Sequence, residues 1–246
     1  MTKKLYDRFW EIDFLRGIAI IMMIVFHLLF DIDFFGFYQL DLYSGYLLFF
    51  LYSIGIIFLL LVGISLSLSY NRVKKIYNKN ELFFKFFKRG LKIFLLGLII
   101  TFVSWFYLDS GIIIFGVLHC IGLSIILAFP LLKFRFINLF FGFVFIFIGF
   151  FLRIFKFDFY WLVWLGFKPA QFYTVDYFPL FPWFGVILIG LFLGNTFYQN
   201  YKRKFRLMNL KNFKIIRFFC FLGRNSLLIY FLHQPIIFSI FYLLTY

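Results

Sequence analysis

The sequence predicts an all-α polytopic membrane bundle of about seven transmembrane helices with a cytoplasmic N-terminus. Hydrophobic residues make up 64% of the 246-residue chain, and its mean hydropathy is +0.97, far outside the composition of soluble domains. Apolar runs long enough to cross a bilayer recur along the chain, and the charged residues fall mostly between them. We therefore expect residues 1–246 to form one multi-pass domain in the cell membrane, with the lipid bilayer as its first partner.

Seven apolar stretches of about 20 residues justify the helix count. They cover residues 14–35, 46–69, 91–108, 111–132, 136–155, 178–198 and 225–245. On this division all but three of the 25 Lys and Arg residues lie on one side, the exceptions being Arg153, Lys156 and Lys168. Cytoplasmic loops are enriched in such cations, so the N-terminus is predicted inside and the C-terminus outside. A re-entrant segment between the fourth and fifth stretches would reverse the predicted membrane sidedness of every later loop and of the C-terminus.

The charge pattern also bears on partners and cofactors. A net charge of +15 is explained by membrane topology, so we expect no nucleic acid. The chain has no glycine-rich phosphate loop and no His or Cys cluster with zinc spacing, so we expect no metal and no permanently bound cofactor. Residues 82–92 alternate Phe with cations at helical spacing. Their cations either contact anionic lipid or bind a phosphorylated cosubstrate.

The first stretch and the residue just before it carry four ionisable residues in a polar stripe: Asp13, Arg16, His27 and Asp31. At about 100° per residue, all four fall within one narrow face of a helix. Ionisable groups inside a membrane are costly unless they face protein or water. The stripe is therefore predicted to face the bundle interior and line a site. Asp13 and Arg16 form either a structural pair or a cosubstrate contact.

The three histidines, His27, His119 and His233, all lie in predicted spans. A carboxylate one turn from an imidazole raises the imidazole's basicity, so Asp31 is expected to make His27 a better general base. His119 and His233 are either site residues or interhelical hydrogen-bond partners. No span carries two histidines, which disfavours stacked haems.

Two further segments are candidates for a site. The sixth stretch opens with Asp176 and contains Trp183 after two prolines, so it either rims a pocket or simply begins a helix. In the last stretch Ser226, Tyr230 and His233 follow at helical spacing and form a second polar stripe.

Four segments carry a resemblance to a known family. They are residues 11–20 (EIDFLRGIAI), 115–123 (FGVLHCIGL), 177–185 (YFPLFPWFG) and 223–235 (GRNSLLIYFLHQP). The chain resembles the transmembrane acyltransferases, in particular small prokaryotic relatives of the heparan-alpha-glucosaminide N-acetyltransferase catalytic domain. The animal enzyme's proposed acyl-carrying histidine lies in an outer loop, whereas residues 34–46 here contain no histidine. His27 is therefore assigned as a base through its likeness to the broader O-acyltransferase group, although the sequence leaves open that it carries the acyl group.

The resemblance implies transfer of an acetyl or other short acyl group from cytoplasmic acetyl-CoA, the cosubstrate, to a sugar or amino sugar of the cell envelope. His27 and Asp31 are the expected catalytic residues. Candidates for holding the cosubstrate are Asp13, Arg16, His119, Arg224, Asn225 and Ser226. Candidates for holding the acceptor are Asp176, Trp183, Tyr230 and His233.

Two other functions fit the same residues. A small transporter or flippase for a lipid-linked sugar would use His27 and Asp31 as a proton relay, but no second copy of the Asp-x-x-Arg-Gly motif indicates an inverted repeat. A structural partner of a sugar-polymer synthase is the third interpretation. A homodimer is one assembly compatible with the sequence.

Overall fold

The fold is built from helices alone. The computed structural model describes residues 8–108 and 110–245, so Lys3, Lys4 and Asp109 of the charge pattern lie outside the described residues. Within these ranges the chain forms eight α-helices and no strand. The helices are α1 (Trp10–Phe34), α2 (Gly45–Val73), α3 (Lys79–Tyr107), α4 (Val117–Leu127), α5 (Phe136–Leu152), α6 (Leu180–Phe197), α7 (Lys214–Arg224) and α8 (Ser226–Thr245). The all-α prediction is confirmed.

The chain divides into two compact units, which are described separately. The first unit runs to Leu61 and resumes at Leu207, and the second covers Val62–Arg206. The helix α2 passes from one unit into the other.

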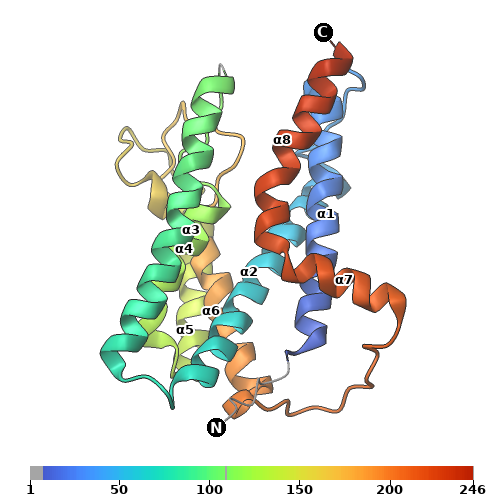
Figure 1. Cartoon of the computed structure of the whole chain (residues 1–246). Helices are drawn as coiled ribbons and strands as arrows, with labels where there is room; N and C mark the ends of the chain where they lie inside the picture. The colour runs from blue at the N-terminus through green and yellow to red at the C-terminus, as the bar shows by residue number, and fades with distance from the viewer. Residues whose placement is uncertain (1–7, 109, 246) are drawn as a thin grey trace. The chain divides into compact units, whose positions relative to one another are not determined.

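The first unit packs α1 against α7, α8 and the start of α2. Its core includes Ile20, Met23 and Phe26 of α1 and Ile54 of α2. Figure 1 shows α1 and α8 running side by side in this unit. The backbones of α1 and α7 touch at two glycines: a Cβ at Gly17 would collide with the carbonyl of the facing helix, and so would one at Gly223. This contact brings Gly223 of α7 against the Asp13 carbonyl of α1.

The second unit holds α3 to α6 and the end of α2. A capping box starts α3, in which the Asn78 side chain accepts from the Glu81 N–H and the Glu81 carboxylate accepts from the Asn78 N–H. Close glycine contacts join α3 to α4 at Gly90 and Gly122. The long connection between α5 and α6 runs beside residues 111–116, where Phe115 and Tyr177 form an isolated bridge.

The number of membrane crossings differs in detail from the sequence prediction. Five helices, α1, α2, α3, α6 and α8, are long and apolar enough to cross a membrane, while α4 and α5 are shorter apolar helices. The predicted span 111–132 is wrong in length, because α4 has 11 residues and a length of about 16 Å, about half the thickness of a hydrocarbon core. Residues 111–116 are not helical: Gly111 has φ +83° and its carbonyl accepts from the Val175 N–H. The count of seven spans is not confirmed.

Two basic segments form helices. Residues 82–92, which have helical spacing in the sequence, lie in the first half of α3 and are continuous with the third span. A separate amphipathic helix, α7, occupies part of the basic stretch that was predicted as a loop. It exposes Ile215, Phe218 and Phe221 together with Lys214 and Arg217, the composition of a helix that lies at a membrane surface.

Candidate active site

The polar stripe of α1 faces α7 and α8 along its whole length. Asp13 and Arg16 contact the end of α7, whereas His27 and Asp31 contact α8. The four residues share one helix face, as predicted. They form two groups, one near each end of the stripe, and both groups lie within the first unit.

The first group is a carboxylate shared by two arginines. Asp13 is 3.2 Å from the Arg16 Nη1 and 3.3 Å from the Arg224 Nε, and its side chain is only 8% exposed. Arg16 also donates to the Gly223 carbonyl at 3.2 Å, which the glycine contact between α1 and α7 brings within reach. Arg224 keeps 51% of its side chain exposed. A structural pair between Asp13 and Arg16 is therefore present, and Arg224 adds an accessible cation beside it.

The second group begins with two histidines. The rings of His27 and His233 meet edge to face, with centroids 4.7 Å apart. The His233 Nδ1 lies 2.7 Å from the Tyr230 carbonyl oxygen. Because a carbonyl can only accept, this nitrogen carries the proton, and the Nε2 of neutral His233 is left with a lone pair. Both that Nε2 and the His27 Nδ1 are buried without a hydrogen-bond partner in the part of the chain that the structure describes.

The group continues with a carboxyl and an amide. Asp31 is fully buried, and its Oδ1 accepts a 2.8 Å hydrogen bond from the Gln234 Nε2. The Asp31 Oδ2 and the Gln234 Oε1 are buried without a partner. We expected Asp31 to orient His27, but its hydrogen bond runs to α8. Gln234 was not among the site residues predicted from the sequence, although an amide directly after a histidine in an apolar span was the signal for it.

The remaining candidates on α7 and α8 surround these groups. Asn225 follows α7 and its Nδ2 donates to the Phe221 carbonyl at 2.9 Å. Ser226 is the first residue of α8. The ring of Tyr230 lies 5.6 Å from that of His233. All three belong to the first unit with the α1 stripe.

His119 lies in the second unit, where both ring nitrogens have local partners. Its Nδ1 accepts from the Gly116 N–H at 3.2 Å, and its Nε2 lies 3.4 Å from the Thr101 Oγ1. The Thr101 hydroxyl in turn donates to the Ile113 carbonyl at 2.6 Å. The ring packs against Gly97, where a Cβ would lie 3.0 Å from it. This arrangement joins α3, α4 and residues 111–116, and it favours a structural role over a cosubstrate contact.

Asp176 belongs to the same part of the second unit. Its Oδ2 accepts from the Val117 N–H at 3.2 Å, at the first residue of α4. Burial raises the pKa of this carboxyl to about 6, and the Val117 N–H opposes the rise. Trp183 is 6% exposed and its ring lies 4.8 Å from that of Phe178. Both residues thus fix the segment that leads into α6.

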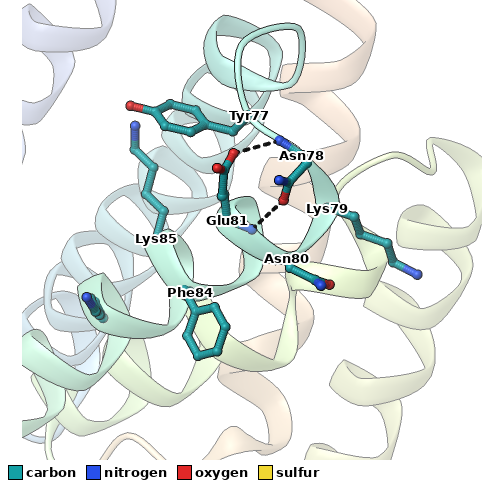
Figure 2. A pocket seen from close by; sticks show the side chains of 8 residues that line it. Tyr77, Asn78, Lys79, Asn80, Glu81, Phe84 and Lys85 are labelled. Atoms are coloured by element: carbon teal, nitrogen blue, oxygen red, sulfur yellow. Dashed lines mark hydrogen bonds between the residues drawn. The ribbon is translucent and has the colours of Figure 1, made fainter.

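A surface depression marks the start of α3 in the second unit. It encloses about 980 Å³ and is lined by Tyr77, Asn78, Lys79, Asn80, Glu81, Phe84, Lys85 and Lys88. Figure 2 shows the two hydrogen bonds of the capping box at its centre, with Lys85 beside Tyr77. The Lys85 Nζ is 4.3 Å from that ring centroid. Glu81 places a carboxylate at the helix N-terminus, and three lysines, Lys79, Lys85 and Lys88, line the same depression.

A metal centre is not supported by the described side chains. No group of three or more His, Cys, Asp or Glu residues within residues 8–108 and 110–245 could hold a metal ion.

Comparison with known proteins agrees with the resemblance seen in the sequence. No curated protein and no solved structure matches the chain. Residues 8–235 match the family described as heparan-alpha-glucosaminide N-acetyltransferase, catalytic. This match covers most of the 246 residues and includes all twelve candidate site residues. The chain therefore belongs to the heparan-alpha-glucosaminide N-acetyltransferase catalytic-domain family, a family of membrane-bound acetyltransferases.

Proposed function

We propose that this membrane acyltransferase moves an acetyl or other short acyl group from cytoplasmic acyl-CoA to a sugar or amino sugar of the cell envelope, in the cell membrane. One observation carries the assignment of residues. A single face of α1 bears a cationic group beside α7 and an unpartnered histidine group beside α8.

The cationic group supports binding of the acyl donor. Arg16 and Arg224 share the single carboxylate of Asp13, so positive charge exceeds negative charge among these three side chains. Guanidinium groups are well suited to phosphate. Asn225 and Ser226 follow Arg224 directly and add polar groups to the same end. The phosphates of acyl-CoA would bind here from the cytoplasm.

The spacing along α1 fits a donor that reaches from one group to the other. Arg16 and His27 are eleven residues apart, or about 16 Å along a helix. The extended pantetheine arm of coenzyme A has a comparable length. A donor held by its phosphates at Arg16 and Arg224 would therefore present its thioester close to His27.

At the histidine group the reaction needs one base and no acyl-enzyme. His27 removes a proton from the acceptor hydroxyl or amine as that atom attacks the thioester carbonyl. The new ester or amide bond forms, the carbon–sulfur bond breaks, and the coenzyme A thiolate leaves and takes up a proton. Asp31 supplies a carboxyl on the same helix face, one turn from His27. Tyr230 and His233, in the same unit as His27, are the proposed contacts to the acceptor.

The test is transfer of labelled acetyl from acetyl-CoA to a panel of amino sugars and envelope glycans. We expect wild type to transfer label and His27→Ala to lose transfer while it still binds coenzyme A. Ser239→Ala is the control, because this exposed α8 hydroxyl bonds only its own helix, at the Pro235 carbonyl. Absence of both coenzyme A binding and transfer in wild type would overturn the proposal. Proton-coupled movement of a lipid-linked sugar in vesicles would then favour the transporter.

A further inference from the structure

Three acceptor atoms of the histidine group point to a hydrogen-bond donor as their partner. The Tyr230 carbonyl fixes the His233 proton on Nδ1, so His233 Nε2 accepts. The Asp31 carboxylate fixes the amide nitrogen of Gln234, so Gln234 Oε1 also accepts. The Asp31 Oδ2 is the third such atom. All three are buried and have no hydrogen-bond partner among residues 8–108 and 110–245.

We propose that His233 Nε2, Gln234 Oε1 and Asp31 Oδ2 form a subsite that receives the N–H or O–H donors of the acyl acceptor beside His27, with Gln234 as the residue that positions Asp31. This inference rests on the proposed function and specifies how the acceptor is held. It adds Gln234 to the site and gives His233 a defined tautomer with its lone pair toward the acceptor.

The burial of these groups argues against a purely packing role. Asp31 is 0% exposed and His233 is 8% exposed, and a buried polar atom without a partner costs about 1–3 kcal/mol. By contrast, His119 in the second unit has a partner for each nitrogen. A histidine that only joins helices is expected to have a partner for both ring nitrogens, as His119 does. The Nε2 of His233 has none among the described residues.

Gln234 controls the geometry of the subsite from α8. Its Nε2 holds one oxygen of Asp31 at 2.8 Å, which directs the other oxygen away from that bond. Its own Oε1 is then the neighbouring acceptor. Loss of the amide would free Asp31 to rotate and would remove one acceptor atom at the same time.

Steady-state kinetics test the inference with an acceptor found in the labelled-acetyl panel. We expect Gln234→Met and His233→Phe each to raise the acceptor KM about tenfold, the effect of about one lost hydrogen bond, with the acetyl-CoA KM unchanged. Gln171→Met makes the same chemical change in an exposed loop and should leave both constants unchanged. Equal changes in both KM values, or no change in the acceptor KM, would overturn the subsite. Absence of transfer in wild type would instead overturn the proposed function.

A second measurement does not depend on turnover. Nitrogen NMR of protein labelled with ¹⁵N-histidine should show His233 with a protonated Nδ1 and an unprotonated Nε2, assigned with His233→Phe. A His233 resonance that reports a protonated Nε2 would overturn the inference even if no acceptor has been found. The same spectrum reports whether Gln234→Met leaves the His233 tautomer, and so the α8 fold, intact.

Discussion

Replacement of His119 separates a structural role from a cosubstrate contact. The ring is 2% exposed, so truncation to Ala leaves a cavity that costs about 2–4 kcal/mol. It also leaves the Gly116 N–H without its acceptor, which adds about 1–3 kcal/mol. We therefore expect His119→Ala to lose about 3–6 kcal/mol of stability, or roughly 10 °C or more in Tm for a unit of this size.

The assay is thermal unfolding of purified protein in lipid nanodiscs, together with equilibrium binding of acetyl-CoA. His119→Gln is the milder variant, because an amide can accept from Gly116 and donate to Thr101 as the imidazole does. It should lose less than half as much Tm, and folded His119→Gln should bind acetyl-CoA as wild type does. An unchanged Tm with acetyl-CoA affinity reduced tenfold would refute the structural reasoning and place His119 at the cosubstrate.

Three further predictions concern other parts of the chain. Gly122→Val should destabilise the second unit by about 3 kcal/mol or more, because its Cβ would lie 2.6 Å from the Phe94 backbone nitrogen. Gly36→Ala is the control, because a Cβ there meets open space and only the positive φ of Gly36 opposes it. An equal loss of Tm in the two variants would contradict the predicted clash at Gly122. The Tm of wild type should fall between pH 4 and 7 more than that of Asp176→Asn. Burial raises the pKa of Asp176 to about 6. Its contribution to the stability of the fold is therefore fully present below the pKa of the unfolded chain and is lost as the pH rises through the pKa of the folded state. Parallel profiles of Tm against pH for wild type and Asp176→Asn would contradict this prediction. Arg224→Gln should raise the acetyl-CoA KM several-fold and leave the acceptor KM unchanged, and an unaffected acetyl-CoA KM at low salt would remove Arg224 from the donor site.

The polar stripe on α1 could be predicted because it depends on helical periodicity alone. Asp13, Arg16, His27 and Asp31 fall on one face at 100° per residue, and the structure places all four against α7 and α8. The partners of these residues could not be predicted in the same way. Which residue of α8 meets Asp31 depends on the register between α1 and α8, and helical periodicity carries no information on that register.

The fourth predicted span failed for a related reason. Residues 111–116 are as apolar as a helix of the membrane, but their hydrogen bonds go to the connection that leads into α6, as from the Phe178 N–H to the Phe115 carbonyl. Hydropathy describes the transfer of side chains from water to an apolar phase. It carries no information on which groups form hydrogen bonds with the backbone N–H and C=O groups. The α7 helix was not predicted, because its cations interrupt the apolar residues and it therefore does not form a continuous apolar span.

The two buried histidine environments allow a final argument about where the chemistry lies. His119 is held with each ring nitrogen engaged, so a proton can leave or join it only when those contacts break. His27 and His233 each keep one buried nitrogen without a partner, beside an amide and a carboxyl in the same condition. Four such atoms at about 1–3 kcal/mol each amount to a large part of the net stability of a typical domain. A chain can tolerate that burden where a bound substrate relieves it, which is why we assign the acceptor to α1 and α8.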